Sequence, residues 1–373
     1  MTAPLLFSHK ESAGEESPSS SYLFMSLVLV DIRSTAPLLL EALNSPTYAP
    51  VSYRISCAFD VVSSFTGFLI RCVDDESDAP LPMPPDLILK LRKAVGETMS
   101  ATIEYLRDRW DAAHAGAMGL HPEARSSATH TPSGIARLPL AWDSATGMLV
   151  EEDAMILAAL RALALWVRED DGGMLRREAA GLSDLFLDLY QASILPPPGD
   201  QKSTKQLDFR SPVLIALEAV SAAKDGIETL LKHAVWDVLT SDLGAILDFT
   251  SKCNDEGEAL RGTDIVRVLL SIAEDGAFSI EEEWMKLVTR VAAWDCPEMT
   301  SEAVVPDVVL EFHVAVLQLV CALVVGADAG MRRRYVHSIA AVVGIAYAVA
   351  SRVGPDSPAA EGIQDVIDTL GAM

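Results

Sequence analysis

Apolar side chains recur at helical spacing along most of this chain. The clearest pattern lies between residues 86 and 114, where apolar positions follow one another at steps of three or four residues. That stripe consists of Leu87, Leu91, Val95, Met99, Ile103, Leu106 and Trp110. No segment shows the alternation of apolar and polar residues that is typical of a strand, so the pattern predicts an all-α protein.

Similar patterns predict helices before and after this segment. Residues 22–43 are apolar at helical spacing, but Pro37 lacks an amide donor and disfavours helix at the preceding residue, so two short helices are expected there. The next helix is predicted at residues 51–72. Beyond residue 149 the pattern predicts a succession of helical hairpins, with helices at 149–167, 174–194, 211–233, 236–251, 258–274, 279–294, 304–325, 331–352 and 358–370.

Segments without helical periodicity suggest how the chain is organised. Residues 1–20 are polar and predict a disordered tail. Residues 21–114 are expected to form an N-terminal helical module. Residues 115–148, rich in Gly, Ser, Thr and Pro, predict a loop or linker, and residues 149–373 a C-terminal module of helical hairpins.

The spacing of the hairpins indicates a repeat architecture. The hairpins that start near residues 258 and 304 are about 46 residues apart, a period compatible with HEAT or armadillo units. Consecutive amphipathic helices with short turns favour an armadillo- or HEAT-like α-solenoid. The alternative is an irregular multi-helix bundle.

Composition and charge narrow the possible partners. Half of the residues are hydrophobic but only 6% are aromatic, which suits helices packed on helices. The net charge of −24 repels phosphate backbones and anionic membrane surfaces, so nucleic acid is not expected as a partner. The apolar segments 312–325 and 339–350 are shorter than the roughly 18 to 20 residues that span a bilayer, which favours buried core helices over membrane contact.

The cysteines and the N-terminus favour a cytoplasmic protein. The five cysteines form no CxxC pair and are odd in number, so buried free thiols in a reducing compartment are expected. The first residues lack the basic and apolar regions of a secretory signal.

The motifs that usually carry chemistry are missing from the sequence. There is no GxGxxG or GxxxxGK[ST] phosphate loop and no GxSxG nucleophile turn. Glu311 and His313 are two residues apart, which would place them on different faces of one helix, so they cannot chelate one ion. His114, His121 and His130 match no metal-site spacing. We therefore predict no catalytic residue, no cofactor and no metal.

Protein binding remains as the expected function. Arg332, Arg333 and Arg334 form the sole basic run and follow an apolar helix. Two interpretations stay open: a solvated helix end, where cations complement the helix dipole, or a docking site for an acidic or phosphorylated peptide. The alternatives to a protein-binding scaffold are a peripheral membrane protein that uses the apolar C-terminal helices, and an enzyme of an unrecognised type.

Part of the N-terminal region resembles a known family. The segments LFMSLVLVDIRST at residues 23–35, LLLE at 38–41 and FDVVSSF at 59–65 are similar to fungal members of the neurochondrin family. The resemblance implies an armadillo-like cytoplasmic protein without an enzymatic site, linked in animals to neurite outgrowth and to signalling through protein contacts.

The chain departs from that family in its length. It is about half as long as usual members and starts within what corresponds to a mid-protein segment, so it is interpreted as a truncated gene model or a shortened paralogue. A repeat array cut at this point would expose its first apolar helix. Leu23, Phe24 and Leu27 of that helix are therefore candidate partner-binding residues, and self-association is expected.

Overall fold

The computed structural model describes most of the chain, and every regular element in the described part is an α-helix. The described residues are 20–43, 45–74, 83–114, 153–170, 172–194, 207–275, 279–294, 305–354 and 357–372. The predicted all-α class is confirmed. The predicted tail, apart from Ser20, and the predicted linker at 115–148 lie outside the described residues and stay predictions.

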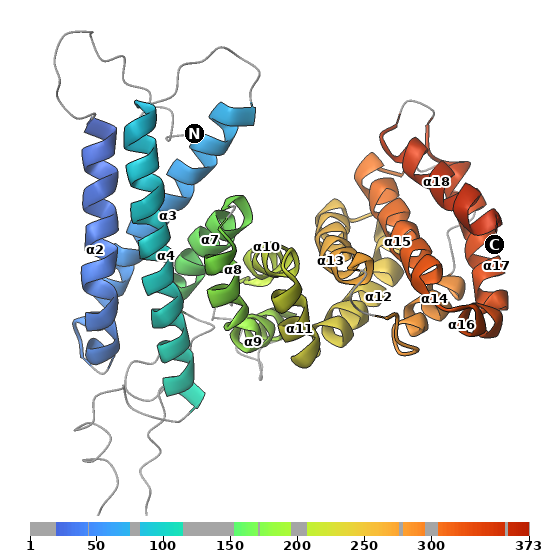
Figure 1. Cartoon of the computed structure of the whole chain (residues 1–373), viewed down its shortest axis with the longest axis horizontal. Helices are drawn as coiled ribbons and strands as arrows, with labels where there is room; N and C mark the ends of the chain where they lie inside the picture. Colours follow the sequence, from blue (N-terminus) through green and yellow to red (C-terminus); the bar gives the residue numbers. More distant parts are fainter. Residues whose placement is uncertain are drawn as a thin grey trace, which may run out of the picture. The chain divides into compact units, whose positions relative to one another are not determined.

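Two compact units make up the chain, and the first is Met1–Ala219. Its helices are α2 (Ser20–Ala42), α3 (Tyr48–Asp74), α4 (Pro85–His114), α7 (Ala154–Glu169), α8 (Gly173–Ala180), α9 (Ser183–Ile194) and most of α10 (Arg210–Ser221). Helix α2 packs against α3 and α4, α3 packs against α7, and α4 packs against α7 and α8 (Figure 1). These helices therefore pack mainly on near neighbours in the sequence.

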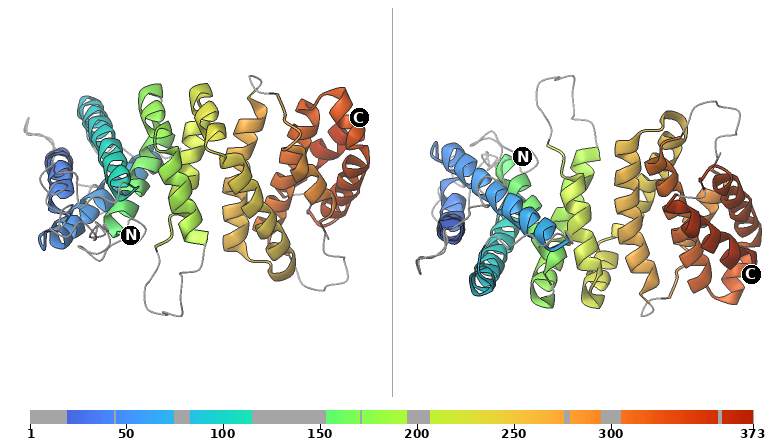
Figure 2. Two further views of the ribbon diagram at one scale, coloured as in Figure 1. Left: turned by 90° about the horizontal axis from the view of Figure 1, so that it is seen from below. Right: turned by 90° about the horizontal axis from the view of Figure 1, so that it is seen from above.

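The second unit is Val220–Met373. Its helices are α11 (Lys224–Lys232), α12 (Val235–Cys253), α13 (Glu256–Glu274), α14 (Met285–Ala292), α15 (Asp307–Gly326), α16 (Ala329–Arg334), α17 (Val336–Ala350) and α18 (Ala359–Gly371). Helix α15 contacts α13, α14, α17 and α18, and Figure 2 gives two further views of these helices. Apolar side chains are buried along the whole of α15, which makes it the centre of this unit's core.

Helix α2 corrects one prediction from the sequence. It runs unbroken through Pro37, so the two short helices expected there are wrong. Pro37 itself is exposed, whereas Ile32 and Ala36 before it and Leu39 after it are buried. Tertiary packing of one continuous face outweighs the local cost of the proline, which is about 3 kcal/mol in a helix interior.

Three other segments break where the sequence predicted a single helix. Residues 174–194 form α8 and α9, residues 211–233 form α10 and α11, and residues 331–352 form α16 and α17. The first break lies at Gly181, whose N–H donates to the Glu178 carbonyl at 3.0 Å. At such turns the apolar pattern continues through a change of direction, so periodicity alone does not reveal the break.

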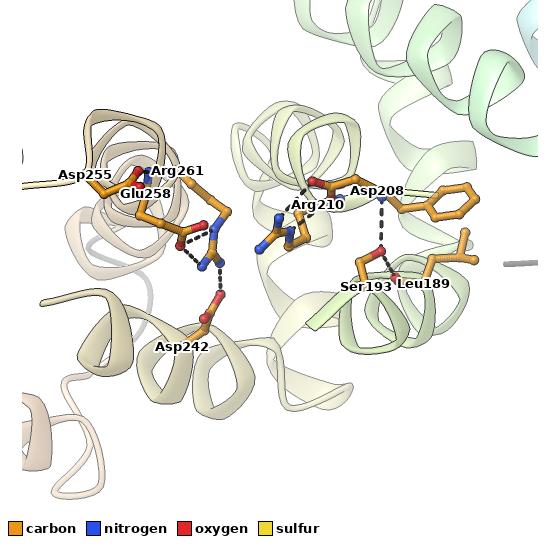
Figure 3. A network of polar contacts seen from close by, with 9 residues as sticks. Leu189, Ser193, Asp208, Arg210, Asp242, Asp255, Glu258 and Arg261 are labelled. Carbon is orange, nitrogen blue, oxygen red and sulfur yellow. Dashed lines mark hydrogen bonds and ion pairs between the residues drawn. The ribbon is translucent and has the colours of Figure 1, made fainter. Parts of the chain in front are cut away.

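Polar contacts hold helix ends and helix pairs in place in each unit. In the second unit Arg261 of α13 pairs with Asp242 of α12 and with Glu258 on its own helix (Figure 3). Arg261 and Asp242 have only 13% and 8% of their side chains exposed, so each charge needs the other in place of water. The Asp255 carboxylate caps α13 by accepting from the Glu258 N–H at 2.9 Å.

In the first unit a serine joins two consecutive helices. The Ser193 hydroxyl, near the end of α9, donates to the Leu189 carbonyl at 2.8 Å. The same hydroxyl accepts from the Phe209 N–H at 3.1 Å (Figure 3). Because Phe209 is fully buried directly before α10, this bond fixes where α10 begins.

A glycine sets the distance between α13 and α15. A Cβ atom on residue 262 would overlap Cε2 of Phe312 and lie 2.7 Å from its Cζ. The Phe312 side chain is fully buried and has no room to move aside. Gly344, in α17, is a matched contrast because no heavy atom lies within 4 Å of its would-be Cβ.

We predict opposite effects of alanine at these two glycines. Gly262→Ala should lower the free energy of unfolding by about 1 to 3 kcal/mol, because overpacking outweighs the gain in helix propensity. Gly344→Ala should raise it by up to about 1 kcal/mol, because only the propensity gain acts there. Urea unfolding followed by circular dichroism measures both, and a stabilised Gly262→Ala variant would contradict the close packing of α13 on α15.

Candidate interaction surfaces

A buried polar cluster joins α3, α4 and the start of α7. The Tyr48 hydroxyl donates a short hydrogen bond to the Asp153 carboxylate, and the Ser52 hydroxyl donates to the same carboxylate at 3.3 Å. Asp153 also caps α7 by accepting from the Met155 N–H at 3.0 Å. Arg109 of α4, with 1% of its surface exposed, supplies a positive charge beside these groups.

Burial sets the protonation of this cluster. Desolvation, together with the negative Asp153 carboxylate, raises the pKa of Tyr48 to about 12. Desolvation also raises the pKa of Tyr105 well above its ordinary value and lowers the pKa of Arg109. Tyr48, Tyr105, Arg109 and Asp153 are each at most 3% exposed, so they are closed to a solute and act by holding helices together.

The sequence contained only part of the signal for this cluster. Asp153 precedes an apolar run, which is the position of an N-cap. Its partner Tyr48 is 105 residues earlier in the chain, and no spacing rule connects the two. Arg109 lies in the clearest predicted helix, where a charged residue is normally expected on the solvent side.

The predicted partner-binding residues of α2 lie on its exposed side. The exposed fractions are 69% for Leu27, 47% for Leu23 and 42% for Phe24. The sequence analysis did not single out Val30 and Leu38, which are 52% and 58% exposed. Leu23, Leu27, Val30 and Leu38 follow one line along the helix, and we call these four residues the α2 stripe.

The other side of α2 is also apolar. Met25, Leu29, Ile32 and Leu39 are fully or almost fully buried against the first unit. Two ion pairs, Arg54 with Asp31 and Arg33 with Glu97 at 2.7 Å, tie the polar edges of the helix to α3 and α4. Helix α2 therefore has one apolar side covered and one apolar side open.

The three predicted arginines lie at the end of a short helix. Arg332, Arg333 and Arg334 close α16, whose N-cap is Asp328. Hydrogen bonds from the Met331 and Gly330 N–H groups lower the pKa of Asp328. Arg334 lies 3.4 Å from Glu282 with both side chains 58% exposed, an arrangement that contributes little to stability. Docking of an acidic peptide on these arginines stays a prediction.

Within the described part of the chain, three helices are long and apolar enough to cross a membrane by length and composition. These are Asp307–Gly326, Ser20–Ala42 and Tyr48–Cys72. The apolar part of the first was expected to be too short to span a bilayer, and the length of the other two was not expected from the sequence. In Asp307–Gly326, 67% of the apolar window is buried, against 33% and 28% in the other two. Among the described residues, exposed large apolar side chains are concentrated on α2, whereas α3 exposes Tyr53 and α15 exposes Val325.

A histidine lies buried in the core of the second unit. His313 is 2% exposed, and its ring meets the Trp294 ring edge-on with 4.7 Å between centroids. Neither ring nitrogen has a hydrogen-bond partner among the described residues. Burial, with the Arg352 cation adding to it, lowers the pKa of His313 to about 4. Glu311 is exposed, so it does not share a site with this ring.

The possible metal ligands and the cysteine thiols are spread over the described residues. Among the described residues no three His, Cys, Asp or Glu side chains gather as metal ligands. His121 and His130 lie outside those residues. The four described cysteines are free, but none is buried: Cys57 and Cys253 are exposed, and Cys72 and Cys321 are half-buried. The expected burial of these thiols is wrong: Cys253 is the last residue of α12, and Cys321 lines an open groove beside α18.

We predict that the Tyr48 hydroxyl contributes to stability and that a neighbouring tyrosine hydroxyl does not. Tyr48→Phe removes a donor from a buried carboxylate and should lower the free energy of unfolding by about 1 to 3 kcal/mol. Tyr53 is on the same helix but 73% exposed, so Tyr53→Phe should change it by less than about 0.5 kcal/mol. Equal urea midpoints for the two variants would contradict the structural role of the cluster.

His313 should make the protein sensitive to acid. Its pKa is lower in the folded than in the unfolded chain, so protons bind the unfolded chain as the pH falls from about 6.5 to about 4. This group alone should remove up to roughly 3 kcal/mol of stability over that range. Comparing urea unfolding of wild type and His313→Leu across the range isolates the effect. The exposed His337→Leu variant is the control, and parallel acid profiles for wild type and His313→Leu would contradict the prediction.

Comparison with known proteins gives the family. The model of the Neurochondrin family matches residues 6–272. An uncharacterized protein of Schizosaccharomyces pombe, C16C4.02c, is 23% identical over 252 residues, which cover 66% of this chain and 36% of that protein. No solved structure matches. The resemblance seen in the sequence is confirmed, and because the family model covers well over half of its residues, the chain belongs to the Neurochondrin family.

Proposed function

We propose that this chain is a non-enzymatic helical-repeat scaffold that acts by binding other proteins. The Neurochondrin family is not a known family of enzymes, which supports this proposal. The observation that carries it is the α2 stripe, four large apolar side chains left open on one helix. Contiguous apolar surface of this kind is typical of a protein interface. Free thiols at the four described cysteines support a cytoplasmic location.

We also propose an armadillo- or HEAT-like arrangement within the units. In each unit the helices that pack most extensively on one another are close in sequence. They are first, second or third neighbours in the order of the described helices, such as α2 with α4 and α13 with α15. Such local packing is expected where helical hairpins stack one on the next. In an irregular bundle, helices distant in sequence would also pack together.

The partner that fits the α2 stripe best is a second copy of the chain. In two copies related by a two-fold axis, the α2 stripe of one copy would pack against the α2 stripe of the other. Each exposed apolar side chain would then contact an apolar side chain of the second copy. The stripe contains no charged residue, although the chain carries a net charge of −24. Repulsion between copies should therefore weaken association at low salt, and added salt should strengthen it.

Sedimentation velocity over a range of protein concentrations tests this proposal. Wild type should self-associate reversibly, and Leu27→Glu should weaken the association at least tenfold, or about 1.4 kcal/mol. Leu260 of α13 is 57% exposed but lies outside the stripe, so Leu260→Glu should leave the association unchanged. A wild-type chain that remains monomeric at about 100 µM, a concentration equivalent to a binding free energy of about −5.5 kcal/mol, would exclude self-association.

A peripheral membrane role is the second candidate. It is motivated by the low burial of the apolar windows of α2 and α3. The version that uses the C-terminal helices has less support, because two-thirds of the window in α15 is already buried. Flotation with neutral and with anionic vesicles separates the two functions: a scaffold stays at the bottom of the gradient, whereas a membrane protein floats and Leu27→Glu abolishes flotation.

A further inference from the structure

A groove of about 700 Å³ opens on the second unit between α13, α15 and α18. These helices pack side by side, α13 on α15 and α15 on α18 (Figure 1). Helix α15 lines the groove from Gln318 to Val325, and α18 lines it from Gly362 to Thr369. On α18 the lining residues are i, i+3, i+4 and i+7, and on α15 they have the same spacing with Gly326, the last residue of the helix, in addition. Each helix therefore contributes one continuous face about two turns long.

We infer that this groove receives an amphipathic helix of a partner protein whose flanks carry Lys or Arg. The inference rests on the proposed scaffold function and names the chemistry of one partner. A groove walled by two helical faces suits a third helix that presents apolar side chains at the same spacing. A volume of about 700 Å³ accommodates several large side chains but not a second packed domain.

Close approaches at its ends define the groove. A Cβ atom on Gly362 would lie 2.7 Å from Nε2 of Gln318 and 3.3 Å from Cγ1 of Val314, so α18 comes near to α15 there. A Cβ atom on Gly326 would lie 2.9 Å from Cγ1 of Ile280, which lines the groove next to the end of α15. Both contacts belong to the packing of the second unit, and the groove lies between them.

The lining is apolar in its depth and open at its edge. Leu270 of α13, Ala322 of α15 and Val366 of α18 line it together with Ile280. Val325 also lines the groove and has 49% of its surface exposed. A half-exposed valine beside buried apolar neighbours gains burial only when another apolar group covers it.

Two carboxylates determine the charge of the expected partner. Glu274 and Asp365 line the groove, and both are exposed. No Lys or Arg among the described residues comes within ion-pair distance of either carboxylate, and no lining residue is basic. A cation on the partner would be the first counter-charge for these two groups, in a chain that is strongly acidic overall.

A second groove shows that this feature is not general. The groove between α4 and α8 in the first unit has a volume of about 600 Å³. Two of the three carboxylates that line it already have counter-charges: Glu97 lies 2.7 Å from Arg33, and Asp170 lies 3.1 Å from Arg92, whereas Glu104 is exposed. The groove at α18 differs in that neither of its carboxylates has a counter-charge among the described residues and no lining residue is basic, whereas Lys93 lines the groove at α4.

Selection of displayed peptides on the full chain tests the inference. The library should present helices of about 18 residues, long enough for five turns, with apolar residues at i, i+3, i+4 and i+7 and random residues on the flanks. We expect the selected peptides to carry Lys or Arg on the flanks. Val325→Glu and Asp365→Lys should each weaken their binding at least tenfold, measured by fluorescence anisotropy.

Matched variants locate the binding and control for folding. Asp368 is exposed on α18 but does not line the groove, so Asp368→Lys makes the same charge change and should leave the affinity unchanged. The double variant Glu274→Lys with Asp365→Lys should prefer versions of the peptides with Glu flanks. Unaltered helical circular dichroism is required of every variant before its affinity is compared.

Three outcomes would overturn the inference. They are no enrichment of any helical peptide, enrichment without basic flanks, and binding that is insensitive to Val325→Glu and Asp365→Lys. Self-association through the α2 stripe is measured separately by sedimentation, so a chain that associates there but selects no peptide here would exclude the groove and leave the proposed scaffold function standing.

Discussion

A helix that is apolar on both sides needs neighbours on both sides, and this constraint governs the structure. Helix α15 satisfies this constraint, because α13, α14, α17 and α18 surround it. Its His313 is so deeply buried that the pKa of the ring is lowered to about 4. Helix α2 satisfies the constraint only in part, because α3 and α4 cover one side. Leu27 is exposed and Leu29 is buried, although they are two residues apart on the same helix. The difference in exposure between the two sides of α2 therefore comes from the number of neighbouring helices and not from composition.

The buried cluster around Asp153 holds together α3 and α4, the helices that cover one side of α2, and the start of α7. Tyr48 at the start of α3 is fixed to the start of α7, and Arg109 adds the counter-charge from α4. Charged groups in such a site need every partner in place, so the cluster fixes α3, α4 and α7 relative to one another. The polar cluster specifies the arrangement, and apolar burial provides most of the stability.

The sequence predicted the helices well because their signal is local. The apolar stripe of residues 86–114 appears as α4, and the all-α class follows from the same periodicity. Prediction was wrong where distant contacts decide: packing carried α2 through Pro37, and turns within continuous apolar patterns separated α8 from α9. Tyr48 and Asp153 were not predicted as a pair because nothing local links residues 105 positions apart.

The two candidate surfaces also differ in how far they could be predicted from the sequence. Leu23, Phe24 and Leu27 were predicted from the sequence, because the apolar helix that carries them lacks a polar face. The stripe on α18 is also visible in the sequence, but a stripe at i, i+3, i+4 and i+7 has the same appearance whether a neighbour covers it or leaves a groove. Only the positions of α13 and α15 show that Val366 and Asp365 line open space.

The two surfaces should respond to salt in opposite directions. Contact between α2 stripes brings two chains of net charge −24 together through uncharged side chains, so screening by salt favours it. Binding of a basic helix at Glu274 and Asp365 uses attraction between unlike charges, so the same screening weakens it. On these two proposals the stripe and the groove would select their partners by different forces, so that neither partner would compete for the other's site.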